Sequence, residues 1–176
     1  PAAADPIESF PAGLECPAGL VIGDSGCKAP VGGERWHLRH QQLLSSRNLT
    51  WREEPELEYY RFGAGPIIPS HRKFYYPAEV EGEMTELPMS CVGGSAAGCP
   101  GLASPKEMQT WKIKYDWEDC SYSAMGKPYR PIEYTPSGHP AIRILAAGTE
   151  SPMCPMPAGA RRELSKGGND DTHHDI

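Results

Sequence analysis

Residues 111–120 read Trp-Lys-Ile-Lys-Tyr-Asp-Trp-Glu-Asp-Cys. Large apolar side chains alternate here with charged ones, so that the two kinds fall on opposite sides of a period-two pattern. The apolar set is Trp111, Ile113, Tyr115 and Trp117. This alternation predicts a half-buried β-strand with an aromatic inner face, and we expect it to be the central strand of a sheet. Cys120 ends the stretch, which would allow a disulfide to fasten the strand.

The composition around this stretch indicates many turns and few long elements. Among the 176 residues, glycine and proline occur 19 times each, which is about twice their usual combined share. We therefore expect short strands joined by irregular loops rather than a helical bundle. The predicted fold class is α+β, disulfide-stapled, with a predominantly antiparallel sheet, one or two short helices and long loops.

Several further segments have the patterns of regular structure. Strand composition or alternation occurs in residues 20–22, 57–62, 73–76, 87–91 and 141–147. Residues 34–44 place apolar side chains at i, i+4, i+7 and i+8, which favours a helix, although Trp36, Leu38 and His40 also alternate as in a strand. Ile67 and Ile68 lie between prolines, as in an edge or a loop. We expect loops over residues 93–105 and 122–140.

The cysteines indicate an oxidising compartment. There are six, they are spread along the chain, and no pair has the Cys-x-x-Cys spacing of a zinc site. They are Cys16, Cys27, Cys91, Cys99, Cys120 and Cys154. Three disulfides are the expected arrangement, with the alternative of six buried reduced thiols. The connectivity stays open, because six cysteines allow about 15 pairings.

Other features fit a secreted protein. The chain starts at Pro1 without methionine and lacks an apolar run of about 20 residues, so we expect a mature chain whose signal peptide has been removed. Asn48-Leu49-Thr50 is an N-glycosylation sequon. The formal net charge of −6 gives no general attraction to nucleic acids or anionic membranes, and neither is expected as a partner.

The chain is divided into three parts by its composition. Residues 1–15 are rich in alanine and proline and are expected to form an extended arm. Residues 16–156 contain all the cysteines and are expected to form a single disulfide-stabilised domain. Residues 157–176 form a polar tail with little to bury, for which we expect flexibility.

Candidate catalytic groups are few. His37 and His40 would share one face of a helix, and with Glu58 or His71 they could form an acid/base pair of the small-ribonuclease kind. The alternative is that these histidines are ordinary surface residues, as is expected of His139 in its turn. No Gly-x-Ser-x-Gly motif supports a nucleophile-elbow hydrolase. The sequence predicts no cofactor and no resident metal.

Aromatic residues are the stronger candidates for binding. Tyr59-Tyr60 and Tyr75-Tyr76 are adjacent pairs in predicted strands, and neighbours on a strand cannot both face inward. Exposed tyrosines beside loops are common at binding surfaces. Tyr59, Tyr60, Tyr75 and Tyr76 are therefore the predicted binding surface, with ordinary sheet packing as the alternative.

In style, the chain resembles the small cysteine-rich secreted proteins of filamentous fungi, in particular the apoplastic effectors of plant pathogens. Trp36-His37-Leu38-Arg39 is similar to the Trp-Arg-(Phe/Leu/Val)-Arg motif of the Leptosphaeria avirulence-and-suppressing effectors, with His37 in place of arginine. That resemblance implies an α/β sandwich held by disulfides, a structural role for Trp36, Leu38 and Arg39, and a host-facing virulence function.

The sequence thus favours a monomeric, secreted, effector-like binding protein that acts on a host protein or a cell-wall component through surface loops. One alternative is a small secreted hydrolase, either a ribonuclease or a carbohydrate-active enzyme, that uses a histidine and a carboxylate. A wall-associated structural protein without a dedicated site is a third reading.

Overall fold

The computed structural model describes residues 16–146. Within this part, the elements in chain order are β1 (Leu20–Gly23), β2 (Val31–Gly33), α1 (Glu34–Ser46), β3 (Arg52–Arg61), β4 (Ile67–Val80), β5 (Glu83–Val92), the 3-10 helix η1 (Gly94–Ala96), β6 (Leu102–Ala103), α2 (Pro105–Thr110), β7 (Lys114–Asp116), β8 (Ser121–Ser123), β9 (Arg130–Pro131), β10 (Glu133–Tyr134) and β11 (Pro140–Arg143). The predicted α+β class, built mainly on β-structure, is confirmed.

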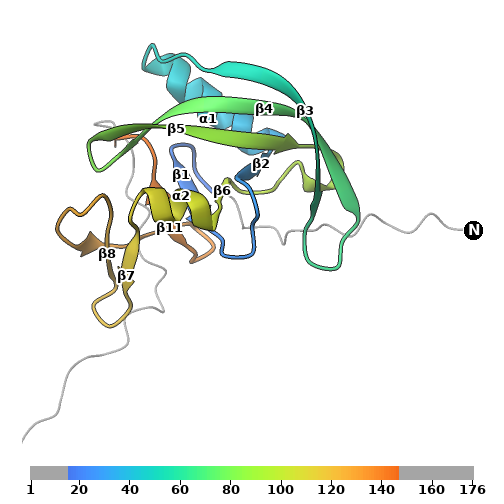
Figure 1. Cartoon of the computed structure of the whole chain (residues 1–176). Coiled ribbons are helices and arrows are strands. Elements are labelled where there is room, and N and C mark those ends of the chain that lie inside the picture. Colours follow the sequence, from blue (N-terminus) through green and yellow to red (C-terminus); the bar gives the residue numbers. More distant parts are fainter. Residues whose placement is uncertain (1–15, 147–176) are drawn as a thin grey trace, which may run out of the picture.

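Most strands belong to one eight-stranded sheet with the order β10-β11-β1-β6-β2-β5-β4-β3. The long strands β3, β4 and β5 form an antiparallel ribbon, whereas β1 and β6, and β2 and β5, run parallel. A separate three-stranded sheet, β7-β8-β9, lies beside the main sheet at the lower left of Figure 1. None of the described helices is long and apolar enough to cross a membrane.

Helix α1 covers one face of the ribbon (Figure 1). Its apolar period turns Trp36, His37, His40 and Leu44 inward, where all four are buried, and so the predicted helix is confirmed. Every second residue of β4 from Phe74 to Val80 is buried as well. The side chains of these two sets form the larger part of the core, because a helix stripe and a strand face can only be buried against each other.

Two β-bulges bend the ribbon. One register shift lies between Pro55 and Glu58 in the β3–β4 pair, and another lies between Ser70 and Arg72 in the β4–β5 pair. Bulges increase the local twist and re-aim side chains. As a result, the β3–β4 turn lies close to the loop after β1 (Figure 1), although β3 is at one edge of the sheet and β1 is near the other.

The predicted central strand at residues 111–118 is wrong. Trp111 ends α2, with its backbone N–H bonded to the carbonyl of Glu107 at 2.9 Å. Lys112 has a φ of 51°, which interrupts an extended backbone, and only Lys114–Asp116 forms a strand, in the small sheet. Trp111 is therefore buried while Trp117 is 61% exposed, so the aromatic row does not share one face.

The loops predicted over residues 93–105 and 122–140 hold short elements. The first contains η1 and β6, and the second contains β9 and β10. Ile67 and Ile68, expected at an edge or in a loop, begin β4 instead. Strands β9 and β10 complete edges of the two sheets, and β6 joins β1 to β2 inside the main sheet. Such pairings depend on distant partners rather than on local composition.

The predicted disulfide staples are not seen. No two of the five cysteines in residues 16–146 are joined to each other, and Cys154 lies outside that range. The Cys27 thiol donates instead to the carbonyl of Ala29 at 2.8 Å, and that of Cys99 to the carbonyl of Pro100 at 3.3 Å. Strand pairing and the buried core hold the described fold together. The predicted arm and tail also lie outside the described residues.

Gly101 provides a test of how α1 is packed. A Cβ atom at this position would lie 2.5 Å from Cε2 of Trp36, whose indole is fully buried and cannot move aside. We expect Gly101→Ala to lower the free energy of unfolding by about 1–3 kcal/mol, as overpacking does, measured by urea denaturation.

Gly98→Ala is the matched control. The nearest atom to a Cβ there is Nη1 of Arg35 at 3.8 Å, which is ordinary contact with a flexible side chain. Equal stability losses in the two variants would contradict this packing.

Candidate functional site

A cavity of about 1030 Å³ lies between the end of β3 and the loop after β1. We call it the β3 cavity. One wall is formed by residues 58–65, which include the β3–β4 turn, and the other by residues 22–29. Pro100, Leu102 and His139 complete the lining. The cavity therefore forms because the ribbon is bent, which brings the edge strand β3 opposite β1 and β6.

Tyr60 forms the β3 wall. Its side chain passes β4, and its hydroxyl donates to Oγ of Ser90 on β5 at 2.7 Å. The rings of Tyr60 and Phe62 stack with centroids 6.3 Å apart and planes 13° from parallel. Burial raises the pKa of Tyr60 to about 12, so its hydroxyl stays protonated near neutral pH and remains a hydrogen-bond donor.

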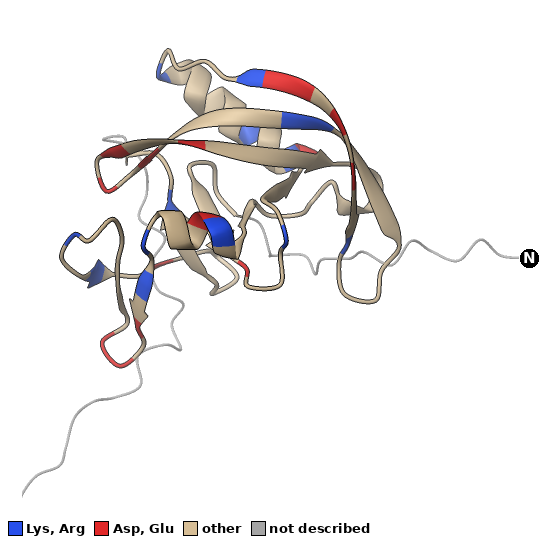
Figure 2. Ribbon diagram, viewed as in Figure 1, with Lys and Arg blue, Asp and Glu red and all other residues tan. Residues whose placement is uncertain are grey.

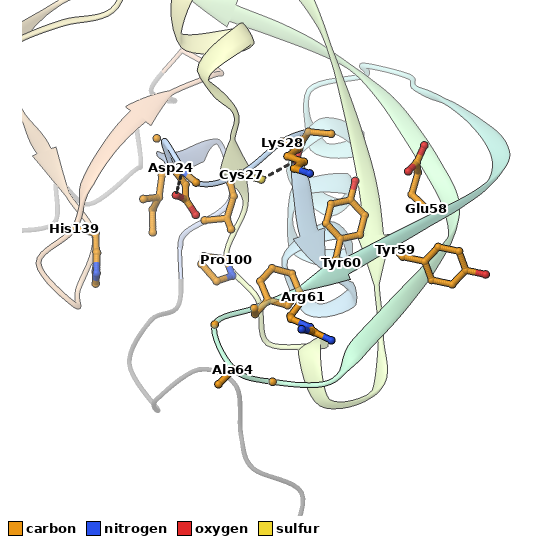
Figure 3. A pocket seen from close by; sticks show the side chains of 18 residues that line it. Asp24, Cys27, Lys28, Glu58, Tyr59, Tyr60, Arg61, Ala64, Pro100 and His139 are labelled. Atoms are coloured by element: carbon orange, nitrogen blue, oxygen red, sulfur yellow. Dashed lines mark hydrogen bonds between the residues drawn. The ribbon is translucent and has the colours of Figure 1, made fainter.

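A compact loop forms the opposite wall. Oδ1 of Asp24 accepts the backbone N–H of Gly26 at 2.8 Å, and the N–H of Cys27 donates to the carbonyl of Asp24 at 3.2 Å. This turn presents Cys27 to the cavity (Figure 3). Burial raises the pKa of the Cys27 thiol to about 11, so the sulfur is a poor nucleophile at neutral pH.

A partly buried ion pair lies at the two bulges. Oε2 of Glu56 lies 3.0 Å from Nζ of Lys73, and Oε1 of Glu56 accepts the hydroxyl of Ser70 at 2.7 Å. The Ser70 Oγ also accepts the N–H of Cys91 at 3.1 Å. The Ser70 hydroxyl thereby gives the Cys91 N–H, a backbone group at the second bulge, a side-chain partner, as a bulge inside a sheet requires.

The other acidic residues of β3 are exposed, and Figure 2 shows their positions along the strand in red. Several are matched by cations on β3 and β4. Arg52 pairs with Glu54 and Glu86, and Arg72 lies 3.9 Å from Glu53. These pairs are exposed and each contributes little to stability.

The predicted catalytic residues are not brought together. His37 and His40 belong to α1 and are buried against Phe74 and Tyr76, on the face of the ribbon away from the β3 cavity. His71 lies in the exposed bulge of β4, and Glu58 lies at the rim of the cavity. Every ion pair between described residues joins an arginine or lysine to a carboxylate. The predicted acid/base pair is therefore not assembled.

The two buried histidines have structural contacts. Nδ1 of His37 lies 2.6 Å from the hydroxyl of Tyr76, and Nε2 lies 3.1 Å from the carbonyl of Ser90. A carbonyl can only accept, so Nε2 carries the proton and Tyr76 donates to Nδ1. Nδ1 of His40 accepts the N–H of Gly19 at 3.2 Å. The His40 ring stacks on the indole of Trp36, with the ring centroids 4.6 Å apart.

The four predicted binding tyrosines fall in different environments. Tyr59 is 64% exposed, and Tyr60 lines the β3 cavity. Tyr75 is covered by the guanidinium of Arg52, 3.5 Å from its ring centroid. Tyr76 is fully buried beside His37. Tyr60 thus lines the cavity, whereas Tyr59, its neighbour on β3, lies at the rim and extends away from Tyr60 (Figure 3).

Sequence reasoning missed most of the cavity. Asp24, Lys28, Arg61, Pro100 and His139 come from four separate segments, and no local pattern indicates that these segments meet. The turn glycines of residues 23–26 and 63–65 predict loops but not their contact.

Asn48 is exposed in the turn after α1 with a φ of 57°, so its sequon is accessible, and glycosylation stays a prediction. The described residues contain no cluster of three or more metal-ligating side chains.

Comparison of the chain with family models, curated proteins and solved structures found no match. The resemblance of residues 36–39 to an effector motif therefore stays a prediction. In the structure, that segment lies in the first turns of α1, where Trp36 is buried and Leu38 is exposed.

The buried histidines predict loss of stability in acid. Burial lowers the pKa of His37 to about 4 and that of His40 to about 3, against about 6.5 in the unfolded chain. The unfolded state therefore binds protons first, and the stabilisation present above pH 6.5 is lost as the pH falls toward 4. Linkage gives a loss of about 3 kcal/mol per histidine at pH 4.

Urea unfolding at pH 7.5, 5.5 and 4.0 checks this expectation. His40→Phe should remove about half of the loss between pH 6.5 and 4, whereas His139→Gln, at an exposed position, should leave it unchanged. An identical pH dependence in the wild type and in His40→Phe would contradict the assignment.

Proposed function

We propose that the protein acts by binding a ligand in the β3 cavity, and that this binding underlies the effector-like role expected from the sequence. The cavity itself is the observation that carries the proposal. Its volume of about 1030 Å³ is at the upper end of the range for small-molecule sites, and such sites combine apolar and aromatic walls with a few polar groups. The β3 cavity combines the two in this way, with Tyr60, Phe62 and Leu102 in its walls beside Lys28 and Arg61.

The size of the cavity suits either a small molecule or a short segment of a larger partner. Tyr59 lies at the rim of the cavity and is 64% exposed, so its ring would extend the contact for a host protein or a cell-wall polymer. Aromatic side chains at a rim are frequent anchors of such interfaces.

Secretion remains part of the proposal, supported by the accessible sequon at Asn48. The proposal does not require disulfides. Burial raises the pKa of Cys27 and Cys91 to about 11, so these thiols stay protonated and weakly nucleophilic at neutral pH. The hydrolase alternative gains no support, because hydrogen bonds in the core hold His37 and His40 away from the cavity.

Amide NMR spectra of the ¹⁵N-labelled protein test the proposal. The panel consists of small aromatic and aliphatic compounds, together with soluble cello-, chito- and galacturonate oligosaccharides. We expect at least one member to shift the amides of Gly26, Tyr60 and Gly63 in a saturable manner.

Ala64→Trp should abolish these shifts, because Ala64 lines the cavity and an indole there would fill it. Gln42→Trp, on an exposed position of α1, is the control and should bind as the wild type does. The proposal fails if no panel member shifts the cavity amides, or if Ala64→Trp leaves the shifts unchanged.

A further inference from the structure

Two cations at the β3 cavity lack a carboxylate partner. Lys28 and Arg61 both line the cavity, and neither belongs to any ion pair between described residues. The cations nearby on the ribbon are matched, as Lys73 is by Glu56 and Arg72 by Glu34 and Glu53. The cavity thus has two positive groups whose charge is not neutralised by a direct contact.

Lys28 comes from the loop after β1 and Arg61 from the end of β3, so each wall of the cavity contributes one cation. In the view of Figure 3, both lie toward Tyr60, with Asp24 and His139 across from them. Glu58 extends beyond β3, away from His139 (Figure 3). The Asp24 carboxylate accepts the N–H of Gly26 within its own loop. The acidic groups of the lining are therefore either turned outward or engaged by a hydrogen bond within their own loop.

The remaining lining is largely apolar. Ile22, Phe62, Pro100 and Leu102 line the cavity together with the ring of Tyr60 and several glycines. Binding of hydrocarbon or of an aromatic ring against such a surface is favourable, and the stabilisation is proportional to the apolar area removed from water. A small, fully hydrated anion would leave this surface uncovered.

We propose that the ligand of the β3 cavity is an organic anion, with an apolar body against Phe62 and Leu102 and an acidic group between Lys28 and Arg61. A guanidinium can hold a carboxylate, sulfate or phosphate through two parallel hydrogen bonds, and an ammonium adds a point charge. This inference rests on the proposed function, since it names the chemical class that the cavity selects. The acidic group has the same role whether an aliphatic acid or an acidic sugar carries it.

Matched pairs of probes test the charge requirement. Octanoate is compared with octanamide, and a galacturonate tetramer with cellotetraose, by titration of the cavity amides in NMR spectra. The wild type should bind the acidic member of at least one pair about tenfold more tightly, a difference of about 1.4 kcal/mol. This preference should shrink as NaCl is added, because salt screens charges at an open site.

Lys28→Gln/Arg61→Gln should reduce the preference to about equal affinity while binding of the neutral member is retained. Lys106→Gln/Lys114→Gln removes the same charge from exposed positions outside the cavity and should retain the preference. Equal binding of acidic and neutral probes by the wild type would overturn the anion class but leave the cavity as a binding site. No shift of the cavity amides with any probe would overturn both proposals.

Discussion

Ser90 of β5 accepts two hydrogen bonds on which the arrangement of the site depends. Its Oγ accepts the hydroxyl of Tyr60 at 2.7 Å, and its carbonyl accepts Nε2–H of His37 at 3.1 Å. The first bond crosses β4 and fixes the edge strand β3 in its bent position. The second connects the same residue to α1. One buried residue thus joins the wall of the β3 cavity to the core, and the bulges at Pro55–Glu58 and Ser70–Arg72 supply the bend that makes the first bond attainable.

The ribbon β3–β5 has a different role on each face. Phe74 and Tyr76 point toward α1 and are buried with Trp36, whereas Lys73 and Ser90, which are register partners, lie on the other face with Tyr60. Alternation along a strand makes this division unavoidable. The core can therefore hold the ribbon rigid on one side while the loops before β2 and β4 form a cavity on the other.

Local patterns predicted the elements far better than they predicted their arrangement. The period of residues 34–44 identified α1, and composition located parts of β3, β4 and β5. The prediction at residues 111–118 failed because alternation of side chains does not reveal a positive φ at Lys112. Ser104-Pro105-Lys106-Glu107 has the Ser-x-x-Glu pattern and early proline of a helix start, and this indication of α2 was missed.

His37 and His40 were interpreted as surface or catalytic groups, but their partners, Tyr76 and Gly19, are distant in sequence. The cavity could not be predicted from the sequence for the same reason, because it depends on bulges and on contacts between four separate segments.

A double-mutant cycle on Tyr60→Phe and Ser90→Ala, measured by urea unfolding, tests most directly whether the Tyr60–Ser90 bond holds β3 in place. We expect a coupling free energy of about 0.5–1.5 kcal/mol, the usual net contribution of one hydrogen bond. The cycle with Tyr59→Phe, whose side chain is exposed, should give no coupling. Strictly additive effects of Tyr60→Phe and Ser90→Ala would show that this hydrogen bond does not hold β3 in place.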